Sequence, residues 1–309
     1  MERLAIAVVL ASCGGDSPVR VDAGSASDAP VAPGDPLVGI GAVEQIQGGF
    51  QFTEGPQWRD DAGDLLFSDI PADTIYRYVP GSAPVVFRTP SNHANGLAAG
   101  GPDTFLAAEH GSRSVTRTTG STITTVASGF EGKRLNSPND VIAAPLGIYF
   151  TDPPFGIADA DRELDFMGVF RVDGDGAVIA EFRGALASRP NGIGISPDGA
   201  RLYVSDTADG NVYQFPIDPN TGALGPRALH AETSGNPDGL AIDVAGNVFV
   251  ATSTGVEVFA PDGTRWGVIA VPEQPANCAF GDADHQTLYI TARSGLYAVR
   301  LAHAGLPDH

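Results

Sequence analysis

The sequence predicts an all-β protein, and three observations lead to that prediction. Glycine and proline account for 39 and 24 of the 309 residues, which is typical of a chain with many tight turns. Short apolar runs rich in β-branched and aromatic residues stand between these turns, as antiparallel strands require. A short polar peptide also recurs six times before an apolar run, at intervals between 39 and 52 residues. Together these features predict one repeated unit of β-structure.

The recurring peptides begin with a carboxylate or amide side chain, and we call these residues the head residues: Glu54, Asn95, Asn139, Asn191, Asp238 and Asn277. In the fifth unit, four apolar segments follow the head, at residues 240–242, 248–251, 255–259 and 266–269. Units of about 40 to 50 residues with four antiparallel strands are typical of β-propeller blades. The sequence therefore predicts a six-bladed β-propeller with four-stranded antiparallel blades around a central channel, over residues 37–309. Two separate β-sandwiches would not explain the recurring head.

Two further segments have a place in this prediction. Residues 37–47 have strand character but no blade of their own. We expect them to complete the last blade by pairing with the strand around residues 297–301, which removes a free sheet edge. The third unit carries extra residues around 153–166, and we expect an insertion between its second and third strands, over one face of the ring.

The N-terminus resembles a bacterial lipoprotein signal over residues 1–13, with an apolar run that ends in Leu10-Ala11-Ser12-Cys13. Cys13 would then carry the lipid. Residues 14–36 are rich in Gly, Ser, Asp, Ala and Pro, so we expect a disordered tether. These features predict secretion through a signal peptide and a lipid-anchored protein of the cell envelope, on the outer membrane or the periplasmic side. A wrongly assigned start codon or a buried strand is the alternative.

Charge and hydropathy exclude two classes of protein. The chain has 18 basic and 37 acidic residues and a formal net charge of −19, so nucleic acid would be repelled. No stretch of 18 apolar residues could span a bilayer. We therefore expect no nucleic-acid partner and contact with a membrane only through the lipid anchor. A closed propeller can be a monomer, and we expect one.

The head residues predict a cation site. Equivalent positions of propeller blades form a ring about the axis, so the six head residues should converge in the channel. Asn and Asp are also common turn residues, which is the plainer explanation for any single one. Converging carboxylates, however, repel one another unless a proton or a cation lies between them. Oxygen ligands without His or Cys suit a hard cation, Ca²⁺ first and Mg²⁺ or Mn²⁺ next.

Several motifs resemble the SMP-30/gluconolactonase/LRE-like family: Glu54-Gly55-Pro56, Glu109-His110-Gly111, Arg134 to Asp140, Tyr149 to Pro154, Pro190-Asn191-Gly192 and Pro237-Asp238-Gly239. The resemblance spans residues 52–292. It implies a six-bladed propeller with one catalytic divalent metal ion in the channel, Ca²⁺ by preference, with Mg²⁺, Mn²⁺ or Zn²⁺ as alternatives. It also implies metal ligands at Glu54, Asn139, Asn191 and Asp238.

The chemistry implied by the resemblance is hydrolysis of a small-molecule sugar lactone. Asp238 would be both ligand and general base, although a carboxylate on a cation has a lowered pKa and is a weak base. Substrate contacts would come from Arg134, Asn136, Asn95, Glu109 and His110. Two other functions stay open: a phosphotriesterase-like hydrolase, and a non-catalytic propeller that binds a sugar or a protein.

Overall fold

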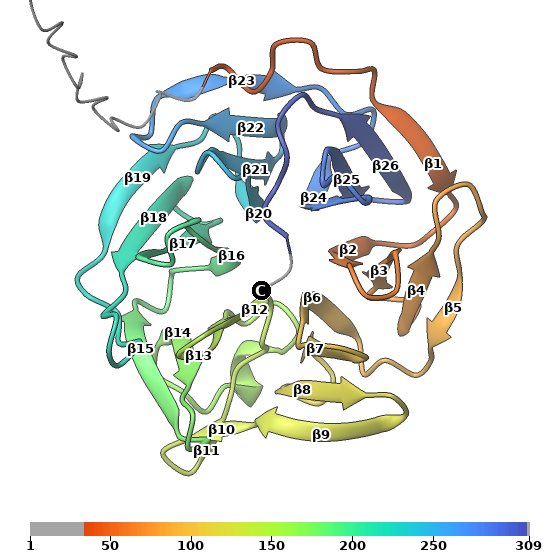
Figure 1. Ribbon diagram of the computed structural model, residues 1–309. Coiled ribbons are helices and arrows are strands. Elements are labelled where there is room, and N and C mark those ends of the chain that lie inside the picture. The colour runs from red at the N-terminus through yellow and green to blue at the C-terminus, as the bar shows by residue number, and fades with distance from the viewer. Residues whose placement is uncertain (1–33, 308–309) are drawn as a thin grey trace, which may run out of the picture. The chain divides into compact units, whose positions relative to one another are not determined.

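The computed structural model describes residues 34–307 and has six four-stranded antiparallel sheets arranged around an axis (Figure 1). This confirms the predicted six-bladed β-propeller. The proposed signal over residues 1–13, its Cys13 and most of the proposed tether lie outside the described residues. Within residues 34–307, no helix is long and apolar enough to cross a membrane.

Each of the first five blades consists of four strands that follow one another in sequence. Blade 1 consists of β2 (Thr53–Arg59), β3 (Asp64–Asp69), β4 (Thr74–Tyr78) and β5 (Val85–Arg88). Blade 2 consists of β6 (Ala94–Ala99), β7 (Thr104–Glu109), β8 (Ser114–Thr119) and β9 (Thr122–Ala127). Blade 3 consists of β12 (Val141–Ala144), β13 (Gly147–Asp152), β14 (Met167–Val172) and β15 (Val178–Gly184). Blade 4 consists of β16 (Pro190–Ile195), β17 (Arg201–Asp206), β18 (Asn211–Pro216) and β19 (Ala228–Glu232). Blade 5 consists of β20 (Pro237–Ile242), β21 (Val248–Thr252), β22 (Gly255–Phe259) and β23 (Arg265–Ile269).

The sixth blade joins the two ends of the described chain. Its strands are β24 (Pro275–Gly281), β25 (Thr287–Ala292), β26 (Gly295–Arg300) and, at the outer edge, β1 (Glu44–Gly48). Strand β1 pairs with β26 in the register Glu44 to Ala298 and Gly48 to Gly295. The predicted ring closure is confirmed, although the strand is shorter than residues 37–47. Leu37, Ile40 and Val43 instead pack against the core of blades 5 and 6.

The extra residues of blade 3 lie between β13 and β14, its second and third strands, as predicted. They contain one short 3₁₀ helix, Asp159–Asp161. A separate hairpin of β10 (Gly129–Phe130) and β11 (Lys133–Arg134) precedes blade 3. The hydrophobic core is divided among the interfaces between neighbouring blades, and one large cluster combines residues of blades 2 and 3. This packing fixes each blade against the next and so fixes the head residues relative to one another.

Candidate active site

The head residues lie at the start of the innermost strand of each blade. Five of them lie within β2, β6, β16, β20 and β24, and Asn139 precedes β12 by one residue. The pairing register shifts at the head peptide in all five of these strands, as in β-bulges. A bulge redirects a side chain that regular pleating would point elsewhere. Five of the six heads are therefore strand residues at bulges, and the alternative that they are ordinary turn residues does not hold for these five.

Amide side chains from three blades are joined by hydrogen bonds. Nδ2 of Asn95 donates to Oδ1 of Asn139 at 2.6 Å, and Nδ2 of Asn139 donates to Oδ1 of Asn191 at 2.5 Å. Nδ2 of Asn191 donates in turn to Oγ1 of Thr207 at 2.9 Å. The three asparagines are buried. The predicted convergence of the heads is thus realised between blades 2, 3 and 4.

The two carboxyl head residues, Glu54 and Asp238, lie close enough for the charge of one to affect the pKa of the other. Burial raises the pKa of Glu54 well above its ordinary value, and the nearby Asp238 raises it further. Asp238 as a whole is half-buried, and burial of its carboxyl group raises the pKa to about 7. Hydrogen bonding with the Asn191 amide and the positive charge of Arg293 lower this pKa. Two carboxyl groups in one poorly solvated place favour the uptake of a proton or a cation.

The glycine after each of several heads permits the close approach of the next blade. A Cβ atom on Gly192 would lie 2.4 Å from the carbonyl oxygen of Asp238. A Cβ atom on Gly239 would lie 1.9 Å from Cγ of Asn277. Neither glycine has a positive φ angle. The repeated Asn-Gly and Asp-Gly pairs are therefore explained by packing between blades.

A second set of residues that hold the ring was missed from the sequence. Hydroxyl groups near the end of second strands donate to the backbone oxygen of the following blade's head: Ser68 to Asn95 at 2.8 Å, Thr151 to Asn191 at 2.6 Å and Ser205 to Asp238 at 2.6 Å. The signal was present as the recurring Ser-Asp or Thr-Asp pair that ends β3, β13 and β17.

The aspartate of each of these pairs caps the backbone. Asp69 accepts hydrogen bonds from the N–H groups of Gln51 and Phe52 at 2.9 and 3.0 Å. Asp152 accepts from those of Asn136 and Ser137, at 2.7 Å each. Asp206 does the same for Arg189 and Ala208. These carboxylates hold the segments that lead into the inner strands, and Asp206 also holds the turn after β17. They thereby stabilise the positions of the head residues without being part of the ring.

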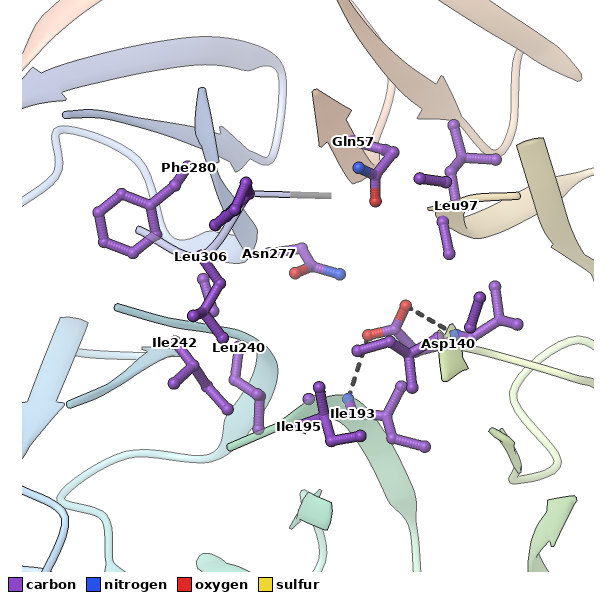
Figure 2. A pocket seen from close by; sticks show the side chains of 18 residues that line it. Gln57, Leu97, Asp140, Ile193, Ile195, Leu240, Ile242, Asn277, Phe280 and Leu306 are labelled. Atoms are coloured by element: carbon purple, nitrogen blue, oxygen red, sulfur yellow. Dashed lines mark hydrogen bonds between the residues drawn. The ribbon is translucent and has the colours of Figure 1, made fainter. Parts of the chain in front are cut away.

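A cavity of about 140 Å³ lies along the inner strands beyond the heads (Figure 2). Its lining is apolar except for Gln57, Asp140 and Asn277. Oδ1 and Oδ2 of Asp140 accept hydrogen bonds from the N–H groups of Val141 and Ile193 at 3.0 and 3.2 Å, and burial raises the pKa of this carboxyl to about 7. The chain after β26 returns to the middle of the ring, where Leu306 joins the lining (Figures 1 and 2).

The predicted substrate-binding residues are in different surroundings. Nε2 of the buried His110 lies 3.3 Å from Nδ2 of Asn95, next to the amide chain, and burial lowers the His110 pKa to about 4. Arg134 is exposed on β11, and its Nη2 donates to the backbone oxygen of Ser112 at 3.3 Å. Asn95 and His110 are therefore at the ring, while Arg134 lies at the surface beside it.

Glu109 and Asn136 are engaged inside the protein. The Glu109 carboxylate accepts hydrogen bonds from Arg88, Asn92, Ser112 and Thr116. Nδ2 of Asn136 donates to the backbone oxygens of Asp152 and Phe166, both at 3.1 Å. Both side chains are fully buried. The structure gives these two residues a supporting position and does not bring them to the head residues.

The donor atoms at the ring fit a hard divalent cation. Glu54 and Asp238 offer carboxylate oxygens, and Asn139 and Asn191 offer amide oxygens, each with a second lone pair beside its hydrogen bond. Oxygen-only sets of this kind are preferred by Ca²⁺ and Mg²⁺. No group of three or more His, Cys, Asp or Glu residues is placed to hold a metal ion within residues 34–307. Amides therefore have to complete any such site.

The sequence pattern described as the SMP-30/Gluconolactonase/LRE-like region matches residues 52–294. The chain belongs to this family. A gluconolactonase from Zymomonas mobilis is 37% identical over 290 residues, which cover 84% of this chain and 81% of that protein. A pentonolactonase from Haloferax volcanii is 31% identical over 257 residues, which cover 78% of this chain and 81% of the relative.

Solved structures described as gluconolactonases are also similar. A gluconolactonase from Xanthomonas campestris superposes with a TM-score of 0.77 at 32% identity, over 84% of this chain and 89% of that one. The family resemblance predicted from the sequence motifs is thereby confirmed. The matched region contains all six head residues.

Proposed function

We propose that this protein hydrolyses a sugar lactone of the gluconolactone class at the ring of head residues. The observation that carries the proposal is the convergence of buried amide and carboxyl groups from neighbouring blades, within a chain 37% identical to a gluconolactonase. The relative that acts on pentonolactones broadens the proposal to aldonolactones of different chain length. In the reaction, water adds to the lactone carbonyl carbon and the ring C–O bond breaks. The single product is an aldonate that carries the former ring oxygen as a hydroxyl group, and one proton is released.

We propose that one divalent cation, Ca²⁺ by preference, is held by Glu54, Asn139, Asn191 and Asp238. When bound, such a cation polarises a carbonyl oxygen and lowers the pKa of associated water. The choice of cation rests on the oxygen-only donor set. Side chains around these four residues are already fixed by hydrogen bonds, so little reorganisation is needed on binding.

We assign the proton transfer to Asp238. Its carboxylate would accept the proton of the attacking water and return it to the ring oxygen as that oxygen leaves. Of the head residues with a carboxyl group, Asp238 is the more open to the channel, since Glu54 is 3% exposed and Asp238 is half-buried. The neutral His110 and the amide of Asn95 would orient the hydroxyl groups of the substrate.

The proposal is tested by acid release from a panel of esters. The panel contains glucono-δ-lactone, a pentonolactone, a simple unsubstituted lactone and a phosphotriester, each measured above its spontaneous hydrolysis. We expect the two sugar lactones to be hydrolysed fastest. A folded protein that hydrolyses only the phosphotriester, or that binds a sugar without hydrolysing any ester, would contradict the proposal and favour one of the two other functions.

We also propose that Cys13 carries a lipid and anchors the protein in the cell envelope, a proposal supported by Leu10-Ala11-Ser12-Cys13 and by the composition of residues 14–36. In bacterial cells, the wild-type protein should fractionate with membranes and incorporate labelled palmitate. The Cys13→Ala variant should lose the label. Equal labelling of both proteins would contradict the anchor.

A further inference from the structure

The blade 3 insertion, residues 153–166, lies directly beside the amide chain. The N–H of Gly156 donates to Oγ of Ser137 at 2.9 Å. A Cβ atom on Gly156 would lie 2.6 Å from Cβ of His110, whose Nε2 is 3.3 Å from Asn95. The first half of the insertion is thus separated from the head residues by a single side chain.

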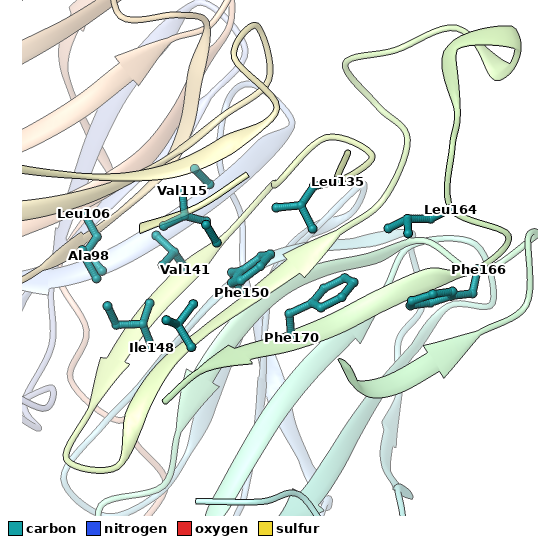
Figure 3. Packing of buried hydrophobic residues seen from close by; sticks show 13 residues of the cluster. Ala98, Leu106, Val115, Leu135, Val141, Ile148, Phe150, Leu164, Phe166 and Phe170 are labelled. Atoms are coloured by element: carbon teal, nitrogen blue, oxygen red, sulfur yellow. The ribbon is translucent and has the colours of Figure 1, made fainter. Parts of the chain in front are cut away.

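The insertion is held in place at several points. The buried Arg113 donates from Nε to the backbone oxygen of Leu135 at 2.7 Å and from Nη1 to that of Asp161 at 3.0 Å. Glu163 accepts a hydrogen bond from the N–H of Arg134 at 2.8 Å. Leu164 and Phe166 are buried in the core shared by blades 2 and 3, as Figure 3 shows. With this many attachments, the insertion forms a fixed wall beside the ring.

Phe155 is the exposed aromatic residue of this wall. Its side chain is 46% exposed, although Gly156 is packed against Ser137 and His110. Among residues 34–307, the other large exposed aromatic side chain is Phe87 on the outer strand β5, at 37%. Exposed apolar groups at the rim of a polar site are frequent features of ligand-binding surfaces.

The chemistry of a sugar lactone supplies a partner for this side chain. Its carbonyl and hydroxyl groups need polar partners, which the head residues and His110 offer. Its ring carbons also present C–H groups, which gain from contact with an apolar surface. The ring of heads is almost wholly polar, so an aromatic group from the neighbouring wall would complete the site.

We propose that Phe155 is a specificity-determining residue that packs against the C–H face of the sugar lactone. This inference rests on the proposed lactonase function. It assigns the binding of the sugar ring to the blade 3 insertion and leaves the reacting carbonyl to the head residues. A side chain that contacts a part of the substrate unchanged in the reaction contributes equally to ground-state and transition-state binding, so it changes KM and leaves kcat unchanged.

The test compares Phe155→Ala with Phe155→Trp and with Phe87→Ala as the matched control. For glucono-δ-lactone we expect Phe155→Ala to raise KM about five- to tenfold with kcat within about twofold, from the loss of one aromatic contact. Phe155→Trp should keep KM near the wild-type value, and Phe87→Ala should not change it. The melting temperature of Phe155→Ala should stay at the wild-type value because the side chain is exposed.

Calorimetric titration with glucono-δ-lactam, a cyclic analogue whose amide bond resists hydrolysis, separates this inference from the proposed reaction when Ca²⁺ is present. Weaker lactam binding by Phe155→Ala supports the contact even if the wild type hydrolyses no lactone, in which case only the reaction is refuted. An active wild type with unchanged KM and unchanged lactam binding in Phe155→Ala overturns the inference alone. A wild type that neither hydrolyses lactones nor binds the lactam overturns both.

Discussion

Nδ2 of Asn139 donates a hydrogen bond of 2.5 Å to Oδ1 of Asn191, although the two residues are 52 positions apart and belong to different blades. Asn139 also accepts from Asn95, which is 44 positions away in the preceding blade. The candidate site is therefore a structure between blades, and it forms only when neighbouring blades pack together. Changes at this chain of amides should affect cation binding and stability together.

Asn139→Ala should lower both properties. The substitution removes the hydrogen bonds that Asn139 makes to Nδ2 of Asn95 and to Oδ1 of Asn191, and a buried polar group that loses its partner costs about 1–3 kcal/mol. We expect the Ca²⁺ affinity to fall at least about tenfold and the melting temperature to fall by several degrees. Asn136→Ala is the matched control, because Asn136 is equally buried but lies in a different network. It should lower the melting temperature and preserve Ca²⁺ affinity; the reverse pattern would refute this assignment.

Gly192→Ala should force blades 4 and 5 apart. The added Cβ atom would lie 2.4 Å from the carbonyl oxygen of Asp238 and 2.7 Å from Cα of Gly239, both of them backbone atoms. Overpacking of this kind costs about 1–3 kcal/mol. Thermal unfolding and Ca²⁺ titration of the variant should both show a loss. Gly174→Ala, where no atom lies within 4 Å, should behave as the wild type.

The architecture was predictable because its signals repeat. Six heads with regular spacing indicate six blades, and the unpaired segment before Glu54 indicates how the ring closes. The bulges at the heads were not predictable, because a bulge depends on the register with a neighbouring strand and not on the local sequence. The alternative that Asn-Gly marks a turn fails at Asn191-Gly192 because packing of Gly192 against the backbone of Asp238 explains the glycine.

The candidate site was predictable in its ligand types and less so in its supporting residues. The carboxylate and amide side chains of the heads can be identified directly from the recurring peptides in the sequence. The burial of Asn136 and Glu109 follows from Phe166, Arg88 and other residues distant in sequence, which no local motif specifies. The hydroxyl groups of Ser68, Thr151 and Ser205 could have been found, because each precedes an aspartate at the same place in its blade.

Ring closure through β1 should contribute measurably to stability. Ile46 is half-buried against a cluster that contains Trp58 and Leu65, and a carboxylate there would lose the apolar contact and become poorly solvated. Ile46→Asp should destabilise the protein by about 2 kcal/mol in urea unfolding. Val38→Asp is the control, because Val38 is 68% exposed. Equal stability of the two variants would show that β1 does not hold the ring.

The metal-free protein should lose stability as the pH rises. The pKa values of Asp140 and Asp238 are raised to about 7, and the ordinary value for Asp is 3.8. Between these values the folded chain keeps protons that the unfolded chain has lost, so this stabilisation is complete below the lower value and is lost by about pH 7. Thermal unfolding at several pH values, after chelation, measures the slope.

Cation binding should release protons from the carboxyl head residues, Glu54 and Asp238. At about pH 6 a divalent cation must displace the proton that Asp238 holds, whereas at about pH 8 Asp238 has lost this proton, so Ca²⁺ affinity should rise with pH over this range. Calorimetry in two buffers with different ionisation enthalpies counts the released protons. A Ca²⁺ affinity that is constant over this range, with no proton release, would place the cation away from these carboxyl groups.

The most direct test of the central claim is hydrolysis of glucono-δ-lactone by the chelated protein before and after Ca²⁺, Mg²⁺, Mn²⁺ or Zn²⁺ is restored, beside Asp238→Ala and the control Asp284→Ala. Asp284 is an exposed carboxylate paired with Arg300, so its loss should leave the rate unchanged. We predict activity that is lost on chelation, is restored by at least one of the four ions, and is absent in Asp238→Ala. Full activity without metal, or in Asp238→Ala, would contradict the account.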